Sequence, residues 1–334
     1  MSNLSTTYMG FNLKNPIIAA SSGLTDSVES LKRLEEAGAA AVVLKSLFEE
    51  EILLEMEQNL KKMQTESFLY PETVDFYEHD EHDDEATMKY LELIANAKKH
   101  LKIPVIASIN CVSASKWTSF PKRIQEAGAD GIELNIFVLP SDFTRTPEQN
   151  EQVYFDIIEE VKKQVTIPIG VKMSPYFSSL GQMLQKVSQT GIKGLTLFNR
   201  FYNPDIDTEY FEITSANVLT SPGNISRPLR WTAIMANRVQ CSLAGSGGVH
   251  SGEAVVKMLL AGADAVQVAS ILYKNGPSYI TTLLHELEDW MKKHDFTSID
   301  EFKGRMSQSQ TSNPAAYERV QFMRYFRGYK KTEF

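Results

Sequence analysis

The chain has 334 residues, 43% of them hydrophobic, and a formal net charge of -8. This length allows a sizeable core in one large α/β domain or in two ordinary domains, and the negative charge argues against a nucleic-acid partner, because phosphate recognition needs a basic patch. No apolar run approaches the ~20 residues of a membrane span, and the N-terminus has no signal-peptide pattern. We therefore expect a soluble cytoplasmic protein without a membrane partner.

The potential metal ligands are scattered along the chain. The two cysteines, Cys111 and Cys241, and the six histidines do not follow the spacing of a disulfide framework or of a zinc site. The acidic run at residues 78–85 contains His79 and His82, but such a run usually forms a solvated charged face. We predict no bound metal.

A repeated phrase organises the chain. Helical patterns end at Gly38, Gly128, Gly191 and Gly262, and a short apolar strand follows each glycine (AVVLK, GIELN, GLTLF and AVQVA). Glycine at this point can adopt the left-handed conformation that terminates a helix. Each phrase therefore predicts the helix-to-strand half of a βαβ unit.

The predicted strands are short and nearly continuously apolar. They are residues 17–20, 41–45, 103–109, 131–136, 167–172, 194–198, 242–245 and 265–269. Continuously apolar strands are typical of parallel strands that are buried on both faces. Eight such strands separated by helices predict a (β/α)8 TIM barrel, with a doubly wound open sheet as the alternative, because strand patterns do not reveal closure.

Two connections are long, at residues 46–102 after the second strand and 199–230 after the sixth. Long loops after barrel strands lie at the catalytic face, so we predict that these insertions form walls or lids of a site. Further along, residues 298–302 predict a short capped helix. Residues 306–334 form a predicted C-terminal extension that packs on the barrel or on a dimer partner.

Residues 243–272 carry a glycine-rich βαβ unit. An apolar strand ends at Ser246, Gly247 and Gly248, a helix spans about residues 252–260, and a second strand ends at Ala269 and Ser270. Glycine lets backbone amides approach an anion closely, and such turns after strands 7 and 8 of a TIM barrel often bind phosphate. A plain tight turn is the alternative.

Polar residues follow the other predicted strands. They are Ser21, Ser22, Lys45, Asn110, Cys111, Asn135, Lys172 and Asn199. In a TIM barrel these strand ends share one cleft. A buried ammonium is costly without a partner, so Lys45 and Lys172 predict either a bound anion or a structural ion pair with Glu133.

Lysines and asparagine amides without a nucleophile–base pair are a poor set for hydrolysis. They suit a flat heterocycle that becomes anionic on reduction, and with a phosphate site they favour FMN. A barrel lyase that forms a Schiff base on lysine is the competing chemistry.

Further motifs match a known family in order and spacing. They are NP at 15–16, SSG at 21–23, KS at 45–46, GIELN at 131–135, GVK at 170–172, PYF at 175–177, Asn199, GSGGV at 245–249 and VAS at 268–270, followed by Lys274, Gly276 and Pro277. On these motifs the chain resembles the dihydroorotate dehydrogenases, most closely the soluble class 1 branch, over roughly residues 5–305.

The resemblance implies a TIM-barrel domain over residues 1–305 that binds FMN and removes two hydrogens from dihydroorotate. A base takes the proton from C5 while N5 of the flavin accepts hydride from C6. The implied cofactor contacts are Lys172 on the flavin ring, Lys45 between flavin and substrate, Asn135 and Asn199 facing both, Ser21, Ser22 and Asn110 beside the ring, and Gly247, Gly248, Ala269, Ser270 and Ser226 around the phosphate. A homodimer and an electron-transfer partner are also expected.

Two segments depart from the family pattern. The family continues its Glu-Leu-Asn motif with Leu-Ser-Cys-Pro-Asn, whose cysteine is the class 1 base, whereas this chain has Val138 at that position. The family's substrate loop is replaced by residues 67–72, which include Glu72. Valine cannot accept a proton, and general acid–base catalysis contributes ~10²–10⁴-fold.

Cys111 and Ser141 are the nearest alternative bases. Dihydroorotate oxidation remains the leading activity, and a different dihydropyrimidine or an enoate-type substrate is the alternative. A flavin-binding subunit without catalysis is a further possibility. Fumarate, NAD through an iron–sulfur partner subunit, and a small carrier all remain open as electron acceptors, and the missing N-terminal helical extension argues against quinone.

Overall fold

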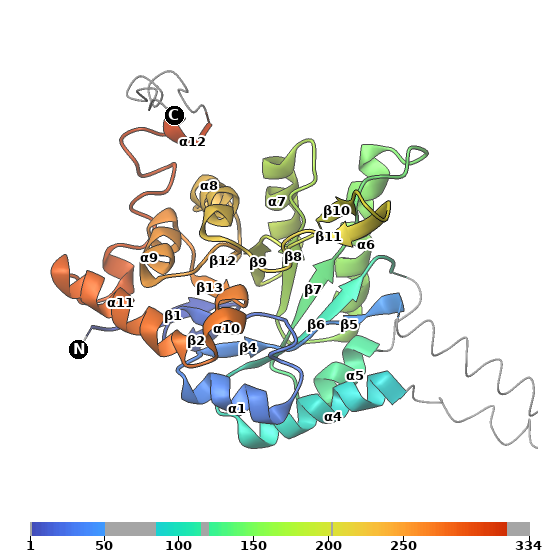
Figure 1. Ribbon diagram of the computed structural model, residues 1–334, viewed down its shortest axis with the longest axis horizontal. Helices are drawn as coiled ribbons and strands as arrows, with labels where there is room; N and C mark the ends of the chain where they lie inside the picture. The colour runs from blue at the N-terminus through green and yellow to red at the C-terminus, as the bar shows by residue number, and fades with distance from the viewer. Residues whose placement is uncertain (1, 51–84, 115–119, 202, 319–334) are drawn as a thin grey trace, which may run out of the picture.

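The computed structural model describes residues 2–50, 85–114, 120–201 and 203–318 (Figure 1). Eight parallel strands form its centre: β3 (Ile17–Ala19), β4 (Ala41–Val43), β6 (Val105–Cys111), β7 (Gly131–Ile136), β8 (Ile169–Met173), β9 (Gly194–Leu197), β12 (Ser242–Ser246) and β13 (Ala265–Val268). Pairing runs β4-β3-β13-β12-β9-β8-β7-β6, and a further β4–β6 pairing closes the ring. The predicted TIM barrel is confirmed, and the open sheet is wrong.

Helices cover the outside of this barrel (Figure 1). They are α1 (Val28–Glu36), α4 (Glu85–His100), α5 (Phe120–Glu126), α6 (Pro147–Gln164), α7 (Leu180–Ser188), α8 (Ser226–Met235), α9 (Gly252–Ala261), α10 (Ser270–Asn275) and α11 (Tyr279–Lys293). The four glycines of the repeated phrase have φ between 90° and 110° after α1, α5, α7 and α9. Their predicted left-handed conformation is confirmed.

Local sequence explains where the helices begin. Ser27 caps α1 by accepting a hydrogen bond from the Ser30 amide. Thr146 and Gln149 form a reciprocal capping box at the start of α6, with Pro147 at the first position of the helix, where its missing N–H costs nothing. These caps fix the point at which the chain turns from a barrel loop into a helix.

The apolar residues form two separate layers. The larger cluster lies between the strands and the surrounding helices. The smaller cluster lies inside the barrel, at the end where the strands begin. The smaller cluster includes Tyr8 and Met9 from a hairpin of β1 (Thr6–Tyr8) and β2 (Phe11–Leu13). The hairpin plugs the barrel at the end where the strands begin, so a site can open only at the other end.

Strand glycines make room for this plug. A Cβ at Gly194 would lie 2.6 Å from Met9 Cγ, and one at Gly170 would lie 2.9 Å from Met9 Sδ. Both glycines lie early in their strands, β9 and β8. Glycine is therefore required there by close packing against the hairpin.

Two loops after barrel strands carry their own structure. The short strand β5 (Leu47–Phe48) pairs with β6. After β9 the chain forms a hairpin of β10 (Pro204–Asp207) and β11 (Glu212–Ser215), and then the 3-10 helix η2 (Pro222–Ile225). Residues 67–72 and nearly all of the acidic run at 78–85, apart from Glu85 at the start of α4, lie outside the described residues.

The C-terminal segment lies along the barrel helices. The 3-10 helix η3 (Ile299–Glu301) matches the predicted short helix. The Met306 amide then donates to Leu260 O at 2.8 Å and the Gln308 amide to Ala233 O at 2.9 Å, before α12 (Ala315–Glu318). The boundary of the extension at residue 305 stays a prediction. Among the described helices, none has the length and hydropathy needed to cross a membrane.

Candidate active site

Three predicted residues lie side by side on neighbouring strands. Asn110 on β6 is the register partner of Asn135 on β7, which is in turn the partner of Lys172 on β8. All three side chains are buried. Residues in register on parallel strands face the same side, so this row crosses the inside of the barrel near the strand ends.

Asn135 is incompletely satisfied. Its Oδ1 atom is buried and has no hydrogen-bond partner among the described residues. A buried acceptor without a donor costs about 1–3 kcal/mol. The position therefore fits an N–H donor on a bound molecule.

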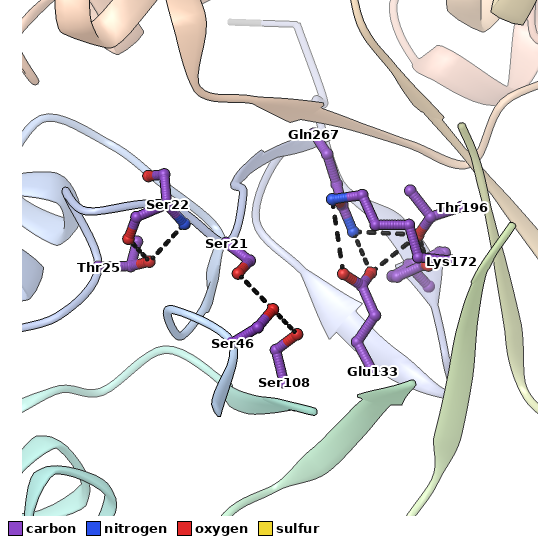
Figure 2. A network of polar contacts seen from close by, with 10 residues as sticks. Ser21, Ser22, Thr25, Ser46, Ser108, Glu133, Lys172, Thr196 and Gln267 are labelled. Carbon is purple, nitrogen blue, oxygen red and sulfur yellow. Dashed lines mark hydrogen bonds and ion pairs between the residues drawn. The ribbon is translucent and has the colours of Figure 1, made fainter. Parts of the chain in front are cut away.

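Lys172 belongs to a buried polar network (Figure 2). Its Nζ donates to Gln267 Oε1 at 3.2 Å and lies 3.7 Å from Glu133 Oε1. Glu133 Oε2 accepts hydrogen bonds from Thr196 Oγ1, at 2.9 Å, and from Gln267 Nε2. The ion pair with Glu133 is thus present, as one of the two alternatives predicted for a buried lysine.

Tyr8 extends the network into the N-terminal hairpin. Its hydroxyl lies 3.1 Å from Thr196 Oγ1. Burial and, after it, the Glu133 carboxylate raise the pKa of the Tyr8 hydroxyl well above its ordinary value. Tyr8 therefore remains a neutral hydrogen-bonding group beneath the network.

Lys45 differs from Lys172, and the prediction that both lysines are buried is wrong for it. Strand β4 ends at Val43, and the Lys45 side chain is exposed. The alternation that turns Ala41 and Val43 into the barrel continues to Lys45. Its ammonium makes no ion pair with any described residue and is free to meet an anion.

The two serines after β3 have different surroundings. Ser21 Oγ lies 3.0 Å from Ser46 Oγ, which lies 2.8 Å from Ser108 Oγ, so three hydroxyls form a chain (Figure 2). Ser22 instead closes a turn, accepting from the Leu24 amide and receiving Thr25 Oγ1 at its carbonyl. Only Ser21 of the two lines the cavity beside Lys172.

A cavity of about 260 Å³ opens beside this row. It gathers many of the residues predicted to bind a cofactor: Ser21, Lys172, Asn199, Gly247, Gly248, Ala269 and Ser270. A neighbouring cavity of about 290 Å³ shares Asn199 and Gly247 and adds Ser226. The two cavities share lining residues and bring together the two glycine-type turns, Ser21, Lys172 and Asn199. The other residues predicted to contact the ring, Ser22, Lys45, Asn110 and Asn135, line neither cavity.

The glycine turn after β12 has the predicted geometry for a close backbone approach. Gly247 and Gly248 have φ of 102° and 74°. A Cβ at Gly248 would lie 2.0 Å from the Ile225 amide nitrogen, whereas one at Gly247 would meet nothing within 4 Å. Gly248 thus lets the η2 segment pack closely, and Gly247 leaves an opening that a bound group can fill.

Thr220 ties the two phosphate-type turns together, which the sequence did not indicate. The Thr220 amide donates to Ser270 Oγ at 3.0 Å, and Lys274 Nζ donates to Thr220 O at 3.1 Å. Thr220 Oγ1 lies 3.0 Å from His250 Nε2. Burial and then the Lys274 ammonium lower the pKa of His250 below its ordinary value, so the imidazole is neutral near pH 7.

The residues considered for proton transfer lie away from this cavity. Cys111 is fully buried in the outer apolar cluster, and burial, followed by the Glu49 carboxylate, raises its pKa well above the ordinary thiol value. Ser141 is exposed, and Val138 lines a separate cavity of about 240 Å³ with Tyr154 and Phe177. None of the three lines the cavity beside Lys172.

Aromatic rings gather at the mouth of the barrel. Phe137 and Phe201, which follow β7 and β9, stack with centroids 4.0 Å apart and planes 17° apart. Tyr176, after β8, meets Phe201 edge to face at 4.8 Å. Tyr176 and Phe201 also line the cavity that contains Ser226 and Asn199. The sequence reasoning did not single out this cluster.

Closed barrels with such turns and a buried lysine at their strand ends form a class of enzymes that bind flat phosphorylated cofactors. The sequence model of one family, described as dihydroorotate dehydrogenase, matches residues 3–291. The chain therefore belongs to the dihydroorotate dehydrogenase family.

Individual relatives agree with this assignment. The catalytic subunit of dihydroorotate dehydrogenase B (NAD(+)) from Thermoplasma volcanium is 26% identical over 315 residues, covering 91% of this chain and 98% of the relative. Dihydroorotate dehydrogenase A (fumarate) from Lactococcus lactis subsp. lactis is also 26% identical, covering 91% and 99%. Dihydropyrimidine dehydrogenase (NADP(+)) of Arabidopsis thaliana is 23% identical, covering 93% and 78%.

Members of this family are FMN-dependent oxidoreductases that act on CH–CH bonds of small molecules. The chain is an oxidoreductase of this type, which replaces the alternative of a Schiff-base lyase.

Proposed function

We propose that the connected cavities bind FMN with its phosphate at the glycine turn. The groups that would hold the phosphate are the backbone amides of Gly247, Gly248, Ala269 and Ser270, with Ser226 from the neighbouring cavity. The open space at Gly247 supports this position. Thr220, which bonds to Ser270 on one side and to His250 on the other, ties the segments after β13 and β12 together.

The flavin ring would lie along the row of strand ends. Lys172 places a buried ammonium in the cavity, and Asn110 and Asn135 extend the row on the neighbouring strands. FMN, when bound, supplies the acceptor for a hydride from the substrate. The Lys172 ammonium stabilises negative charge on the reduced ring, while Ser21 and Asn199 line the same space.

We infer that the substrate is dihydroorotate or a closely related dihydropyrimidine. The observation that carries this inference is the unpartnered Oδ1 of Asn135, inside a row of amides. Amide side chains can both donate to and accept from the alternating N–H and C=O groups of a pyrimidine ring. The free ammonium of Lys45 is suited to a substrate carboxylate, because charge-assisted hydrogen bonds are the strong ones.

The base remains a prediction. Removal of the proton from substrate C5 needs a group within hydrogen-bond reach, and the locations of Cys111 and Ser141 do not favour either residue. Val138 at the family's base position supports a second candidate function, the oxidation or reduction of a different dihydropyrimidine or of an enoate. The aromatic cluster of Phe137, Tyr176 and Phe201 fits a flat substrate without a carboxylate.

Flavin absorbance distinguishes these substrates. We expect the purified chain with FMN to bleach anaerobically with dihydroorotate, and Lys45→Met to weaken this reaction because the substrate carboxylate loses its cation. Dihydrouracil, which has no carboxylate, serves as the control, and its reaction should be weakened less by Lys45→Met than that of dihydroorotate. Bleaching by dihydrouracil alone, or reoxidation of reduced flavin by an enoate alone, would move the substrate to the second candidate. Failure to retain FMN would overturn the proposal.

The expected partners are also proposals. One similar protein is named as a catalytic subunit and another as a fumarate enzyme, which supports an electron acceptor or a partner subunit without choosing between them. We propose that the chain forms a homodimer and works in the cytoplasm. Co-purification with untagged partners from the source cells, followed by an acceptor screen, tests the choice of acceptor.

A further inference from the structure

Glu133 is an acidic residue placed deep inside the barrel. It lies on β7 two residues before Asn135, and its side chain is only 1% exposed. The two carboxylate oxygens have different surroundings. Oε2 accepts from Thr196 and Gln267, whereas Oε1 makes no hydrogen bond with the described residues and faces the Lys172 ammonium at 3.7 Å.

This ion pair is not needed to fill the barrel. The smaller apolar cluster inside the barrel includes Ile18, Val43 and Ile106. Removing two charges from water costs several kcal/mol per ion, and well-packed apolar residues often serve stability better than a buried pair. The pair is therefore better explained by what Lys172 does in the cavity.

The contacts show how Glu133 controls the position of Lys172. Gln267 donates its amide N–H groups to Glu133 and to Thr196, which leaves its Oε1 directed at Lys172 Nζ (Figure 2). Glu133 thus acts on the ammonium directly by charge and indirectly through Gln267. A hydrogen bond between the Tyr8 hydroxyl, on the N-terminal hairpin, and Thr196 Oγ1 holds Thr196 in place. Of the three ammonium hydrogens, one goes to Gln267 and one faces Glu133, so one remains for the cavity.

We propose that Glu133 is a positioning residue that holds the Lys172 ammonium against the cofactor and, by compensating its charge, sets the reduction potential of the bound flavin. This inference rests on the proposed binding of FMN. Reduction adds negative charge to the ring. With Glu133 in place, the ring meets a nearly neutral pair, whereas without it the ring meets a full positive charge in a poorly solvated site. The carboxylate therefore keeps the potential low, which favours passing electrons on.

The test is the midpoint potential of the holoprotein, measured by anaerobic titration against reference dyes. We expect Glu133→Gln, which is nearly isosteric, to bind reduced FMN relative to oxidised FMN at least tenfold more strongly than the wild type, which corresponds to ~30 mV upward for a two-electron couple. Lys172→Met should move the potential downward. In the Lys172→Met background, Glu133→Gln should shift the potential upward by less, because the carboxylate then has no ammonium to hold in place.

Each other outcome counts against the proposal. An unchanged potential in Glu133→Gln, or an equal upward shift with and without Lys172, would overturn it. If Glu133→Gln does not fold, Glu133→Asp keeps the charge but withdraws it from Nζ. A smaller upward shift in that variant supports the proposal, and no shift contradicts it. Wild-type protein that fails to quench FMN fluorescence on titration would remove the proposed function as well, whereas FMN binding with unchanged potentials removes only the role of Glu133.

Discussion

Gly247 and Gly248 share a left-handed backbone for different reasons. At Gly248 any side chain would collide with the backbone of Ile225, whereas at Gly247 the space is open toward the cavity. A substitution at Gly248 therefore disrupts the loop itself. A substitution at Gly247 mainly changes what the cavity can hold.

We predict that Gly247→Ala weakens FMN binding by more than its backbone strain would suggest. Alanine at positive φ costs ~1–2 kcal/mol, and its methyl group would enter the space assigned to phosphate. Gly10, with φ of 84° and nothing within 4 Å of a Cβ, lies in the hairpin at the opposite end of the barrel. Gly10→Ala is the matched control and should lose similar stability in urea but keep FMN affinity. Equal FMN affinity in both variants would place the phosphate elsewhere.

Some contacts of single residues could be predicted from the sequence, and others could not. The pairing of Lys172 with Glu133 could be anticipated, because a charged residue in an apolar strand must find a partner on a nearby strand. The exposure of Lys45 could not be anticipated, since β4 ends at Val43, two residues before the predicted end of the strand at Lys45. The link from Thr220 to Ser270 joins residues 50 positions apart, and nothing local to either position signals it.

The N-terminal hairpin is the element that gives the barrel its closed end. Each of its strands has only three residues, and apolar and polar residues alternate in FNL but not in TTY. A strand of this length carries too little pattern to be predicted. The eight barrel strands were predictable because they are mostly apolar and all but β3 follow a helix, in four cases one ended by glycine.

We predict that Gly194→Ala destabilises the protein by about 1–3 kcal/mol, because a new methyl group overpacks the space that Met9 occupies. The ideal Cβ would also lie 3.0 Å from Tyr8 Cζ. Adding Met9→Ala should restore part of the loss, since the smaller side chain makes room. Urea denaturation of the two single variants and the double variant measures this coupling. Strictly additive losses of unfolding free energy would mean that Met9 does not pack closely against Gly194 of β9.

The β10–β11 hairpin exposes apolar side chains that an isolated chain would leave in contact with water. Ile206 and Ile213 face each other across it, and their side chains are 68% and 78% exposed. A two-stranded hairpin is at best marginally stable in water unless another surface packs on it. A second copy of the chain would supply such a surface, in line with the proposed homodimer.

At the scale of the whole molecule, we predict that Ile213→Asp shifts the protein from dimer to monomer. The aspartate would bring a charge into an apolar contact that the partner copy must cover. Light scattering coupled to size-exclusion chromatography gives the mass directly. Thr214→Asp, on the opposite face of the same strand, is the control and should remain dimeric. A monomeric wild type would contradict the proposal.

Closure of the barrel is the whole-molecule property that the sequence left open. The same eight strand patterns fit an open sheet, and only the pairing of β4 with β6 and of β3 with β13 decides between the two. That pairing depends on curvature and stagger summed around the ring, which no single segment records. The family resemblance, by contrast, rested on short motifs that sequence shows directly.

The seam between β3 and β13 also has a consequence for how the protein is made. Ile17 pairs with Val266, and Asn3 bridges to Ser298, so these early residues find their neighbours among residues that are made much later. The hairpin that seals the barrel floor likewise anchors to late residues, with Thr6 Oγ1 donating to Asp264 O. Contacts of such long sequence separation slow folding. The nascent chain therefore carries an unsealed half-barrel, with its apolar interior exposed, until β13 has been made.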